Sequence, residues 1–348
     1  MSTLVDQFGK PLIIPRSLRR SQRTSELAAQ YDAAITTEEN RTHWRYADNL
    51  SARSANSVEV RSRLRSRARY ECLEANSFAK GICLTLANDT IGRGPSLQLN
   101  VKDDYWRNFI ESEWNAWCKA VKLHSKLRTA RLTKTVDGEV FLLRTNSRRL
   151  MTPVQLNVRL VEADQIATPG YFDGLDPYSC DGIVFDRDYE PQIYHMLLQH
   201  PGDRMAMNAY AKEDISADDI IHLFRAERPG QMRGIPEVTP ALPLFAFLRR
   251  YTLAVILASE LAADFAAVLE TAAAADQEGD YLDELDPFQS APVERGMMTS
   301  LPRGYKMNQF KPEQPVTTYE SFRNAILQEI ARCVHMPANK ARADSSSY

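Results

Sequence analysis

The chain contains little cysteine, and its cysteines show neither metal-binding nor redox spacing. Five cysteines are scattered over 348 residues without a CxxC pair. An odd, sparse set of this kind is typical of free thiols in a reducing compartment, so we expect no disulfide framework. His195 and His200 are five residues apart, with no further cysteine or histidine placed to complete a zinc site.

The sequence also lacks the short motifs of common catalytic sites. It contains no GxSxG, no HExxH and no phosphate-binding loop. The GxG at Gly92–Gly94 has no third glycine at dinucleotide spacing, so we interpret it as a turn into a strand. Glu139 and Glu162 are isolated carboxylates, and His222, beside an apolar run, is interpreted as a satisfied core or interface histidine. These observations predict a protein that is not an enzyme and binds no cofactor or metal.

No apolar run reaches about 18 residues without a charge, the length that a membrane-spanning helix needs. The longest candidate, residues 238–269, is interrupted by Arg249, Arg250, Glu260 and Asp264. The first eleven residues include two charged side chains and a proline, which argues against a signal peptide. We therefore predict a soluble chain without a membrane partner.

The excess of either sign of charge is small, but the charges are unevenly distributed. Lysine and arginine number 43 against 45 acidic residues, so the total of −2 gives no reason to expect a nucleic-acid-binding protein. Residues 1–56 form a polar, basic arm, predicted to be extended and partly disordered with a short helix at 25–34. Such an arm can bind nucleic acid or a scaffold, or simply be solvated. Arginine occupies every second position from 61 to 69, and these side chains cannot all share one helical face.

Helical periodicity is present in the first half of the chain. We predict helices at residues 57–90, 103–118 and 123–135. Asn76-Ser77 interrupts the first of these, with Ser77 as a local cap. The second carries an apolar stripe that indicates core or interface, formed by Trp106, Phe109, Ile110, Trp114 and Trp117.

Short strands and turns follow. Strands are predicted at residues 139–144 and 154–161, and a hairpin joins residues 183–185 to 193–197. These segments, with the helices around them, predict an α+β fold with two or three sub-domains.

Residues 173–190 are rich in carboxylates. A calcium loop needs ligands at alternating positions, a central glycine and a closing glutamate, and that pattern is missing. We interpret residues 186–191 as the turn of the hairpin. A metal-dependent nucleic-acid hydrolase that uses Asp186 and Asp188 is the alternative function.

One stretch connects the β-rich part to a helical part. Ile220 to Phe224 is predicted as a buried strand, because β-branched and aromatic residues cluster there. Pro229 and Gly230 then form a turn, and Gly234 and Pro236 break the backbone again.

A long helix is predicted at residues 237–275. Its apolar residues cover more than one face, and a single chain of this size cannot cover them, so we expect neighbouring subunits to do so. Residues 276–315 begin with a strongly acidic stretch and contain strands near 296–301 and 305–310. A last amphipathic helix covers residues 316–334.

Several of these stretches resemble the lambda-like family of portal proteins of tailed bacteriophages. The most specific is RPGQMRGIP at residues 228–236, preceded by IHLF at 221–224. The other motifs are NSFA at 76–79, IGRG at 91–94, WNAW at 114–117, DGEVF at 137–141 and GIVFD at 182–186. They follow the family's order over residues 57–348. The hairpin turn departs from the family, with Tyr189-Glu190-Pro191 where a glycine is usual.

The resemblance implies a phage portal fold with an α/β wing, long stem helices and a small β-containing clip. It divides the chain into a wing at 57–236, a stem helix at 237–275, a clip at 276–315, a returning stem helix at 316–335 and the start of a tunnel loop at 336–348. The crown of the family would be absent, which implies a truncated chain.

The resemblance also implies a function. Portal subunits, usually twelve, form a ring at one capsid vertex, through which double-stranded DNA is packaged and ejected without regard to sequence. The implied partners are terminase, head-tail adaptor proteins and a major capsid or scaffold protein, and the implied location is the virion, with the host cytoplasm during assembly. An oligomeric scaffold that never contacts DNA is a further alternative.

Three groups of site residues follow from this assignment. The elbow between wing and stem contains Arg228, Pro229, Gly230, Gln231, Arg233, Gly234 and Pro236. Arg228 and Arg233 are expected in structural or inter-subunit ion pairs, and a charge reversal at Arg233 is expected to damage ring assembly first. Lys340 and Arg342 are candidates for transient phosphate contact. Asp280, Asp283, Glu284 and Asp286 would face terminase or an adaptor.

Overall fold

A computed structural model describes residues 37–168, 177–203, 211–264, 268–271, 305–308 and 316–344. The chain divides into one unit up to Leu50 and a second unit from Ser51 to Tyr348. The described part of the first unit is a series of turns, in which the Thr37 amide donates to Asn40 Oδ1 at 2.7 Å. The predicted helix at 25–34 lies outside the described residues.

The second unit begins with three helical segments, and the last two occupy the range of the interrupted helix predicted at 57–90. They are α1 (Ala52–Ala55), α2 (Val58–Arg69), which continues as a π-helical turn (Tyr70–Ala75), and α3 (Ser77–Ile91). The predicted break is present, but Asn76 is the cap rather than Ser77. Asn76 has extended backbone angles, and its Oδ1 accepts from the amides of Phe78 and Ala79.

Two further helices match the predicted segments. They are α4 (Asp104–Ala120), capped by the Asp103 side chain, and α5 (Leu123–Asp137), which ends at Gly138 with a φ of 88°. The strand predicted after Gly92 is wrong, because residues 94–101 form no strand.

A three-stranded antiparallel sheet follows, in the order β2-β1-β7. Its strands are β1 (Glu139–Asn146), β2 (Leu156–Val161) and β7 (Ile220–Phe224). Phe141 is paired with Val161 on one side and with His222 on the other. The strands predicted at 139–144 and 154–161 are thereby confirmed to within two residues.

A second antiparallel sheet has the order β3-β4-β5-β6. Its strands are β3 (Ser179–Cys180), β4 (Ile183–Phe185), β5 (Pro191–Leu197) and β6 (Lys212–Ser216). The predicted hairpin is confirmed as β4–β5. In its turn, the Asp186 carboxylate accepts from the amides of Asp188 and Glu190 and from Gln192 Nε2. This carboxylate therefore holds a turn together.

The prediction that residues 220–224 are buried is only partly right. Ile220 is buried, but Ile221 is 53% exposed and Leu223 is 36% exposed. Since β7 is an edge strand and side chains alternate along a strand, only its even-numbered residues turn toward the core.

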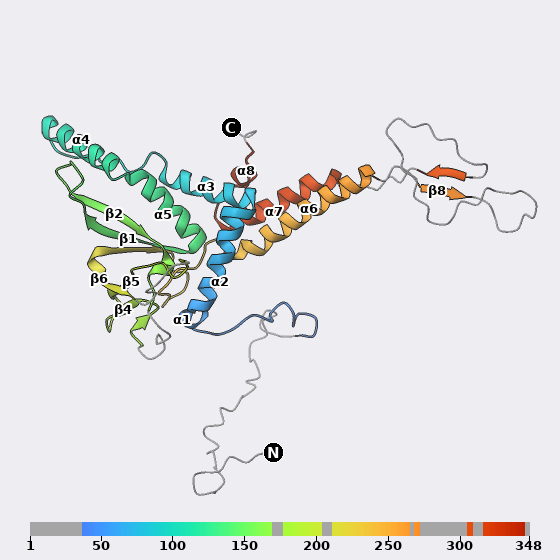
Figure 1. The fold of residues 1–348 in the computed structure, drawn as a ribbon, viewed down its shortest axis with the longest axis horizontal. Coiled ribbons are helices and arrows are strands. Elements are labelled where there is room, and N and C mark those ends of the chain that lie inside the picture. Colours follow the sequence, from blue (N-terminus) through green and yellow to red (C-terminus); the bar gives the residue numbers. More distant parts are fainter. Residues whose placement is uncertain are drawn as a thin grey trace, which may run out of the picture. The chain divides into compact units, whose positions relative to one another are not determined.

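The helical arm consists of α6 (Leu242–Asp264) and α7 (Val316–Cys333), which run side by side in opposite directions (Figure 1). A 3₁₀ turn (Thr239–Ala241) precedes α6, and the short helix α8 (Ala338–Arg342) follows α7. The helix predicted at 237–275 is too long at both ends. At its start the 3₁₀ turn precedes α6, and beyond its end β8 (Val268–Thr271) pairs with β9 (Tyr305–Asn308). The strand predicted at 296–301 lies outside the described residues.

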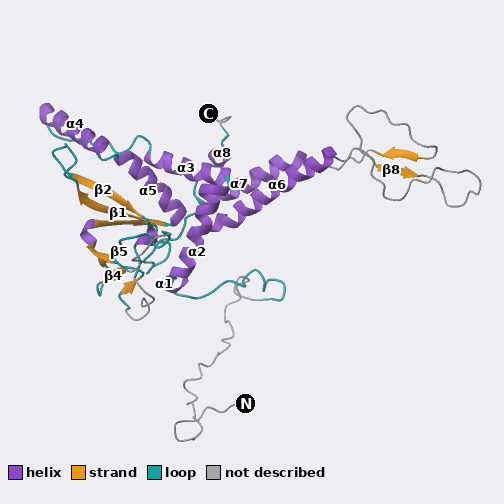
Figure 2. Cartoon of the chain, in the orientation of Figure 1, coloured by secondary structure: helices purple, strands orange, loops and turns teal. Residues whose placement is uncertain are grey.

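Two main cores stabilise this unit. One lies between the two larger sheets and includes Phe141, Ile166 and Tyr194. The other joins α2, α3, α6 and α7 and includes Phe245 and Ile330. Figure 2 shows the helices and the sheets of this unit as separate layers.

Candidate functional site

A group of buried charges lies where the β7–α6 connection meets β1. We call Arg61, Arg65, Glu139, Asp181 and Arg233 the buried charge cluster; each side chain is less than 10% exposed. These residues come from α2, β1, the β3–β4 turn and the connection. The cluster therefore joins four segments that are distant in sequence.

Helix α2 supplies two arginines because of its periodicity. Arg61 and Arg65 are four residues apart and share the buried face, while Arg63 and Arg67 are exposed. The prediction that the alternating arginines do not share one face is confirmed. Their spacing nevertheless places Arg69 on the buried side too, where its Nε bonds Asp137 Oδ1 at 2.7 Å.

Glu139 is the anionic centre of the cluster. Its carboxylate accepts from Arg233 Nε at 3.0 Å and Nη2 at 2.8 Å, and from the Gly234 amide at 2.8 Å. His222 Nε2 lies 3.0 Å from Oε2, and Arg61 and Arg65 contribute longer ion pairs of 3.6 and 3.5 Å. A fully buried carboxylate needs such compensation, because desolvation strongly disfavours its charged form.

Arg233 is satisfied by several partners at once. Besides Glu139, its guanidinium contacts the Asp181 carboxylate at 3.1 Å and donates to the carbonyls of Ile166 and Ala163, each at 3.1 Å. The guanidinium carbon lies 5.4 Å from the centre of the Phe141 ring. Arg233 is therefore in a structural ion pair inside the subunit, one of the two roles expected for it.

The connection reaches Glu139 because two glycines allow a close backbone approach. A Cβ on Gly234 would overlap the Gly138 carbonyl, and a Cβ on Gly138 would overlap the Ile235 carbonyl carbon. The DGEVF and RPGQMRGIP motifs thus pack directly on each other. The contact explains why both motifs contain glycine next to a charged residue of the cluster.

Gln231 holds the turn of the connection in shape. Its Oε1 accepts from the Glu227 amide at 2.9 Å, and its Nε2 donates to the Arg233 carbonyl at 3.0 Å. Gly230 has a φ of 75°, which fits the predicted turn after Pro229. Arg228 is exposed. Beyond the turn, Pro236 accepts from the Thr239 amide at 3.0 Å, at the start of the 3₁₀ turn.

The cluster shifts the pKa values of its members. Burial would raise the pKa of Glu139, but Arg233 and His222 outweigh it and hold that pKa well below its usual value. Burial lowers the pKa of His222 despite the neighbouring Glu139. Burial also lowers the pKa of Arg65, against the pull of Glu139 and Asp164. The native state therefore favours an ionised Glu139 beside a neutral His222.

Sequence reasoning missed Glu139, which it treated as an isolated carboxylate. The signal was indirect: Glu139 follows a glycine and begins a strand that is buried at five successive positions. A charged residue at such a position needs a partner of opposite charge. The sequence contains many arginines, however, and does not reveal which of them is close.

The other predicted site residues lie elsewhere. Lys340 and Arg342 are on α8, which packs against α3, and Lys340 Nζ lies 2.5 Å from Asp89 Oδ2. The predicted clip residues Asp280, Asp283, Glu284 and Asp286 lie outside the described residues.

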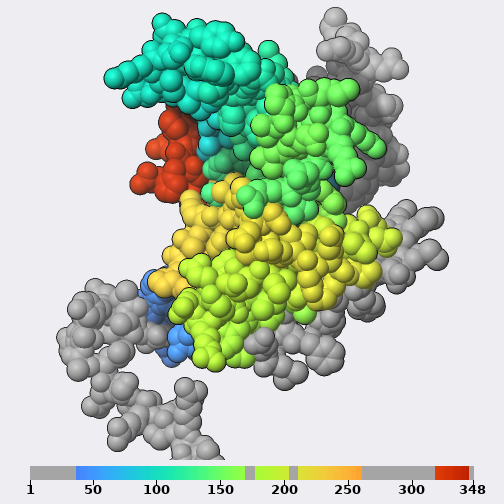
Figure 3. All heavy atoms as spheres, turned by 90° about the vertical axis from the view of Figure 1, so that its left-hand side faces the viewer, coloured from blue at the N-terminus to red at the C-terminus, as the bar shows by residue number. Residues whose placement is uncertain are grey.

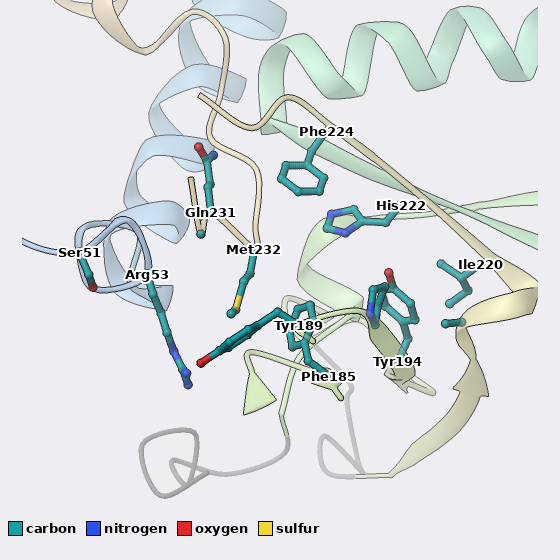
Figure 4. A pocket seen from close by; sticks show the side chains of 13 residues that line it. Ser51, Arg53, Phe185, Tyr189, Tyr194, Ile220, His222, Phe224, Gln231 and Met232 are labelled. Carbon is teal, nitrogen blue, oxygen red and sulfur yellow. The ribbon is translucent and has the colours of Figure 1, made fainter. Parts of the chain in front are cut away.

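A pocket of about 850 Å³ borders the cluster (Figure 4). Figure 4 shows Tyr189 of the β4–β5 turn, His222 and Phe224 of β7, and Gln231 and Met232 of the connection around it. His222 stacks between the rings of Phe141 and Phe224, with centroid distances of 4.3 Å to each. The pocket is thus walled by the same strand and turn that position Arg233.

Glu162, Asp164 and His200 are close enough to share a metal ion. Two arginines already face this group, because Arg69 Nη2 lies 2.9 Å from Asp164 Oδ2 and Arg65 Nη1 lies 3.4 Å from Asp164 Oδ1. These guanidinium groups compensate the carboxylates in the way a cation would. The group therefore gives no reason to revise the expectation that the chain binds no metal.

Helix α6 is apolar on two faces. Phe245 and Leu248 are buried against the helical core, whereas Phe247, Leu253 and Leu257 are each more than 50% exposed. Residues 239–260 are long and apolar enough to cross a membrane by length and composition, with 22% of the most apolar window buried. One such helix is weak support for a membrane span, since helices covered by protein have the same composition.

A family model described as "Phage portal protein, lambda family" matches residues 39–348. The match covers most of the chain, so the fold is that of a phage portal protein. The chain belongs to the lambda family of phage portal proteins.

Comparison with solved structures gives distant likenesses. A chain of "Virion of native gene transfer agent (GTA) particle" is 12% identical, with coverage of 80% of this chain and 69% of that one and a TM-score of 0.48. A chain of "Neck of empty GTA particle computed with C6 symmetry" is 13% identical, with coverage of 79% and 69% and a TM-score of 0.48. A chain of "Neck of native GTA particle computed with C12 symmetry" is 12% identical, with the same coverage and a TM-score of 0.45. Curated proteins gave no significant match.

Proposed function

We propose that copies of this chain form a closed ring at the portal vertex of a virion, through which double-stranded DNA enters during packaging and leaves during ejection. Family membership supports the role. The structural observation that carries the ring is the second apolar face of α6, with Phe247, Leu253 and Leu257 exposed in the single chain. An exposed apolar patch of this kind marks an interface.

A neighbouring copy is the occupant that best fits this face. A heterologous contact, repeated by rotation, covers the same face on every subunit and closes into a ring. The exposed surface of α7 is more polar, since it includes Gln328, Glu329 and Arg332 beside the exposed Phe322. We propose twelve subunits, in line with the family.

The further partners are also proposals. Terminase would dock during packaging, and head-tail adaptor proteins would bind afterwards. A major capsid or scaffold protein would surround the ring, which would form in the host cytoplasm. Asp280, Asp283, Glu284 and Asp286 are proposed to face terminase or an adaptor, and the residues of the β7–α6 connection are proposed as the wing–stem elbow.

The test is a paired substitution on α6. Leu253→Glu with Leu257→Glu places charges on the apolar face, and we expect sedimentation velocity to show monomers where the wild-type chain forms large rings. The matched control is Gln328→Glu with Ala325→Glu on the outer face of α7, which should leave rings intact. Equal assembly of both variants would contradict the assignment of the α6 face.

A further inference from the structure

One surface of this near-neutral protein has a strong excess of positive charge. Residues 77–102 and 114–137, which include α3 and α5, contain nine lysines and arginines and two acidic residues, Asp89 and Asp137. The whole chain has a net charge of −2. A local excess of this size indicates contact with a polyanion.

The cations lie on a continuous surface rather than on separate parts of the molecule. Helices α3 and α5 pack side by side (Figure 1). Arg128 Nε donates to Asn88 Oδ1 at the end of α3, and His124 Nε2 lies 2.8 Å from the Gly92 carbonyl oxygen. Helix α8 reaches this surface, but its Lys340 is paired with Asp89, next to Asn88. We call Arg93, Lys122, His124 and Arg128 the basic face.

Most of this charge is not neutralised within the subunit. Arg128 bonds a neutral amide, and Lys126 Nζ likewise bonds Asn157 Oδ1 at 2.7 Å. The side chains of Arg93 and Lys122 make no ion pair with any described residue. Burial lowers the pKa of Lys126, and the like charge of Lys122 lowers it further. A bound anion would relieve this repulsion.

Two cations of α5 do not belong to the basic face. Arg131 Nη1 lies 2.9 Å from Glu237 Oε2, and Lys134 Nζ lies 3.7 Å from Glu237 Oε1. Their charges tie the end of α5 to the elbow. The basic face is therefore limited to the first half of α5 and the adjoining end of α3.

We propose that the basic face binds the phosphate backbone of double-stranded DNA without reading its sequence. No large apolar side chain of α3 or α5 is exposed, although both helices are fully described. Protein interfaces have an apolar centre, whereas phosphates are bound by lysine and arginine alone. An acidic protein partner therefore fits this surface less well than DNA does. The inference rests on the proposed function, in which DNA passes the subunit.

The binding would be weak for each subunit and strong only when summed over a ring. Each neutralised phosphate adds affinity, and this added affinity falls as the salt concentration rises. Each one makes the slope of log K against log salt steeper by about 0.9. Three side chains per subunit would hold DNA near the ring without arresting its movement. Arg93, Lys122 and Arg128 are the proposed phosphate contacts, whereas Lys340, for which the sequence predicted this role, is paired with Asp89.

The experiment compares two triple variants of the full chain. The first is Arg93→Glu with Lys122→Glu and Arg128→Glu. The control is Arg148→Glu with Arg149→Glu and Arg187→Glu, which changes the charge equally at exposed arginines on other turns. Fluorescence anisotropy measures binding to a labelled duplex of random sequence over a series of salt concentrations, and circular dichroism confirms the fold.

We expect the first variant to bind DNA at least tenfold more weakly, with a salt slope shallower by about 2–3. The control should stay within twofold of the wild type. Equal affinities of the two variants would overturn the proposal. The proposal would also be overturned if polyglutamate of matched charge bound the wild type as tightly as DNA does, since that result would indicate a protein partner.

The milder triple substitution of Arg93, Lys122 and Arg128 to glutamine keeps the test decisive if the charge reversal unfolds the chain. It should reduce affinity in the same direction. Electron microscopy of the same samples separates the two proposals. Rings with normal DNA affinity in the first variant would contradict the basic face alone, and monomeric wild-type chain would contradict the ring alone.

Discussion

Arg233 and Glu139 form the contact that holds the β7–α6 connection against β1. Each is nearly inaccessible to solvent, and each satisfies the other with two or more hydrogen bonds. A buried pair of this kind adds little net stability over an apolar pair, but the loss of one partner leaves an unpaired buried charge. The packing of the β7–α6 connection on β1 is therefore sensitive to single substitutions at these two positions.

Arg233→Met should lower the free energy of unfolding by about 3–5 kcal/mol, because Glu139 would lose its most closely bonded cation and Asp181 would lose one of its two arginine partners. Urea denaturation measures this change. Arg228→Met, in the same turn but exposed, should change stability by less than about 0.5 kcal/mol. Equal effects at the two positions would contradict the account. A charge reversal at Arg233 is accordingly expected to damage folding before ring assembly, in contrast to the expectation from sequence.

The pKa shifts predict loss of stability on acidification. The folded pKa of His222 lies below its unfolded value of about 6.5, so the unfolded chain takes up the proton first and stability falls as pH drops below that value. The depressed pKa of Glu139 acts in the same direction at lower pH, below its unfolded value of about 4.3.

His222→Phe removes one of these titrations. Its melting temperature should depend less on pH between about 6.5 and 5 than that of the wild type. Differential scanning calorimetry over this range measures the difference. The variant also loses the bond to Glu139 and is expected to be less stable at neutral pH. The quantity to compare is therefore the slope of melting temperature against pH. Parallel curves for the two proteins would contradict the role of His222.

Sequence reasoning at this scale identified His222 as a satisfied residue and placed Arg233 in an ion pair, but it could not identify the partner. Arg61, Glu139 and Arg233 are spread over about half of the chain. Periodicity describes which face of one element is buried and contains no information on which elements meet. Charged pairs across elements are therefore found only once the fold is known.

At the scale of elements, the close approach of the connection to β1 depends on glycine. Gly234→Ala should destabilise the chain by about 1–3 kcal/mol, because its Cβ would overlap the Gly138 carbonyl and force the connection away from Glu139. The control is Gly81→Ala in the middle of α3, where a Cβ meets no atom within 4 Å.

Gly81→Ala should stabilise α3 by up to about 1 kcal/mol, since alanine has the higher helix propensity. Thermal unfolding of both variants measures the opposite shifts. Destabilisation by both, or by neither, would show that the close approach is not what constrains the connection.

Helices and the hairpin were predictable because their patterns are local. The segments at 103–118, 123–135 and 316–334 show helical periodicity, and turn residues mark the β4–β5 hairpin. The end of α6 was not predictable, since the apolar residues of Val268–Thr271 suit a helix or a strand equally. Their pairing with β9, across more than thirty residues, decides between the two.

At the scale of the whole molecule, two surfaces are incomplete in a single chain. Among the described residues nothing covers the apolar face of α6, and no carboxylate pairs with Arg93, Lys122 or Arg128 of the basic face. A ring that surrounds DNA would satisfy both, the first by contact between copies and the second by phosphates. The sequence predicted the apolar excess of α6, while the basic face became visible only when α3 and α5 were seen together.

Electron microscopy of the purified chain in negative stain tests the central claim most directly. The account predicts closed rings of about twelve subunits, with a central hole wide enough for a DNA duplex. A uniform population of monomers with the fold intact by circular dichroism would contradict it.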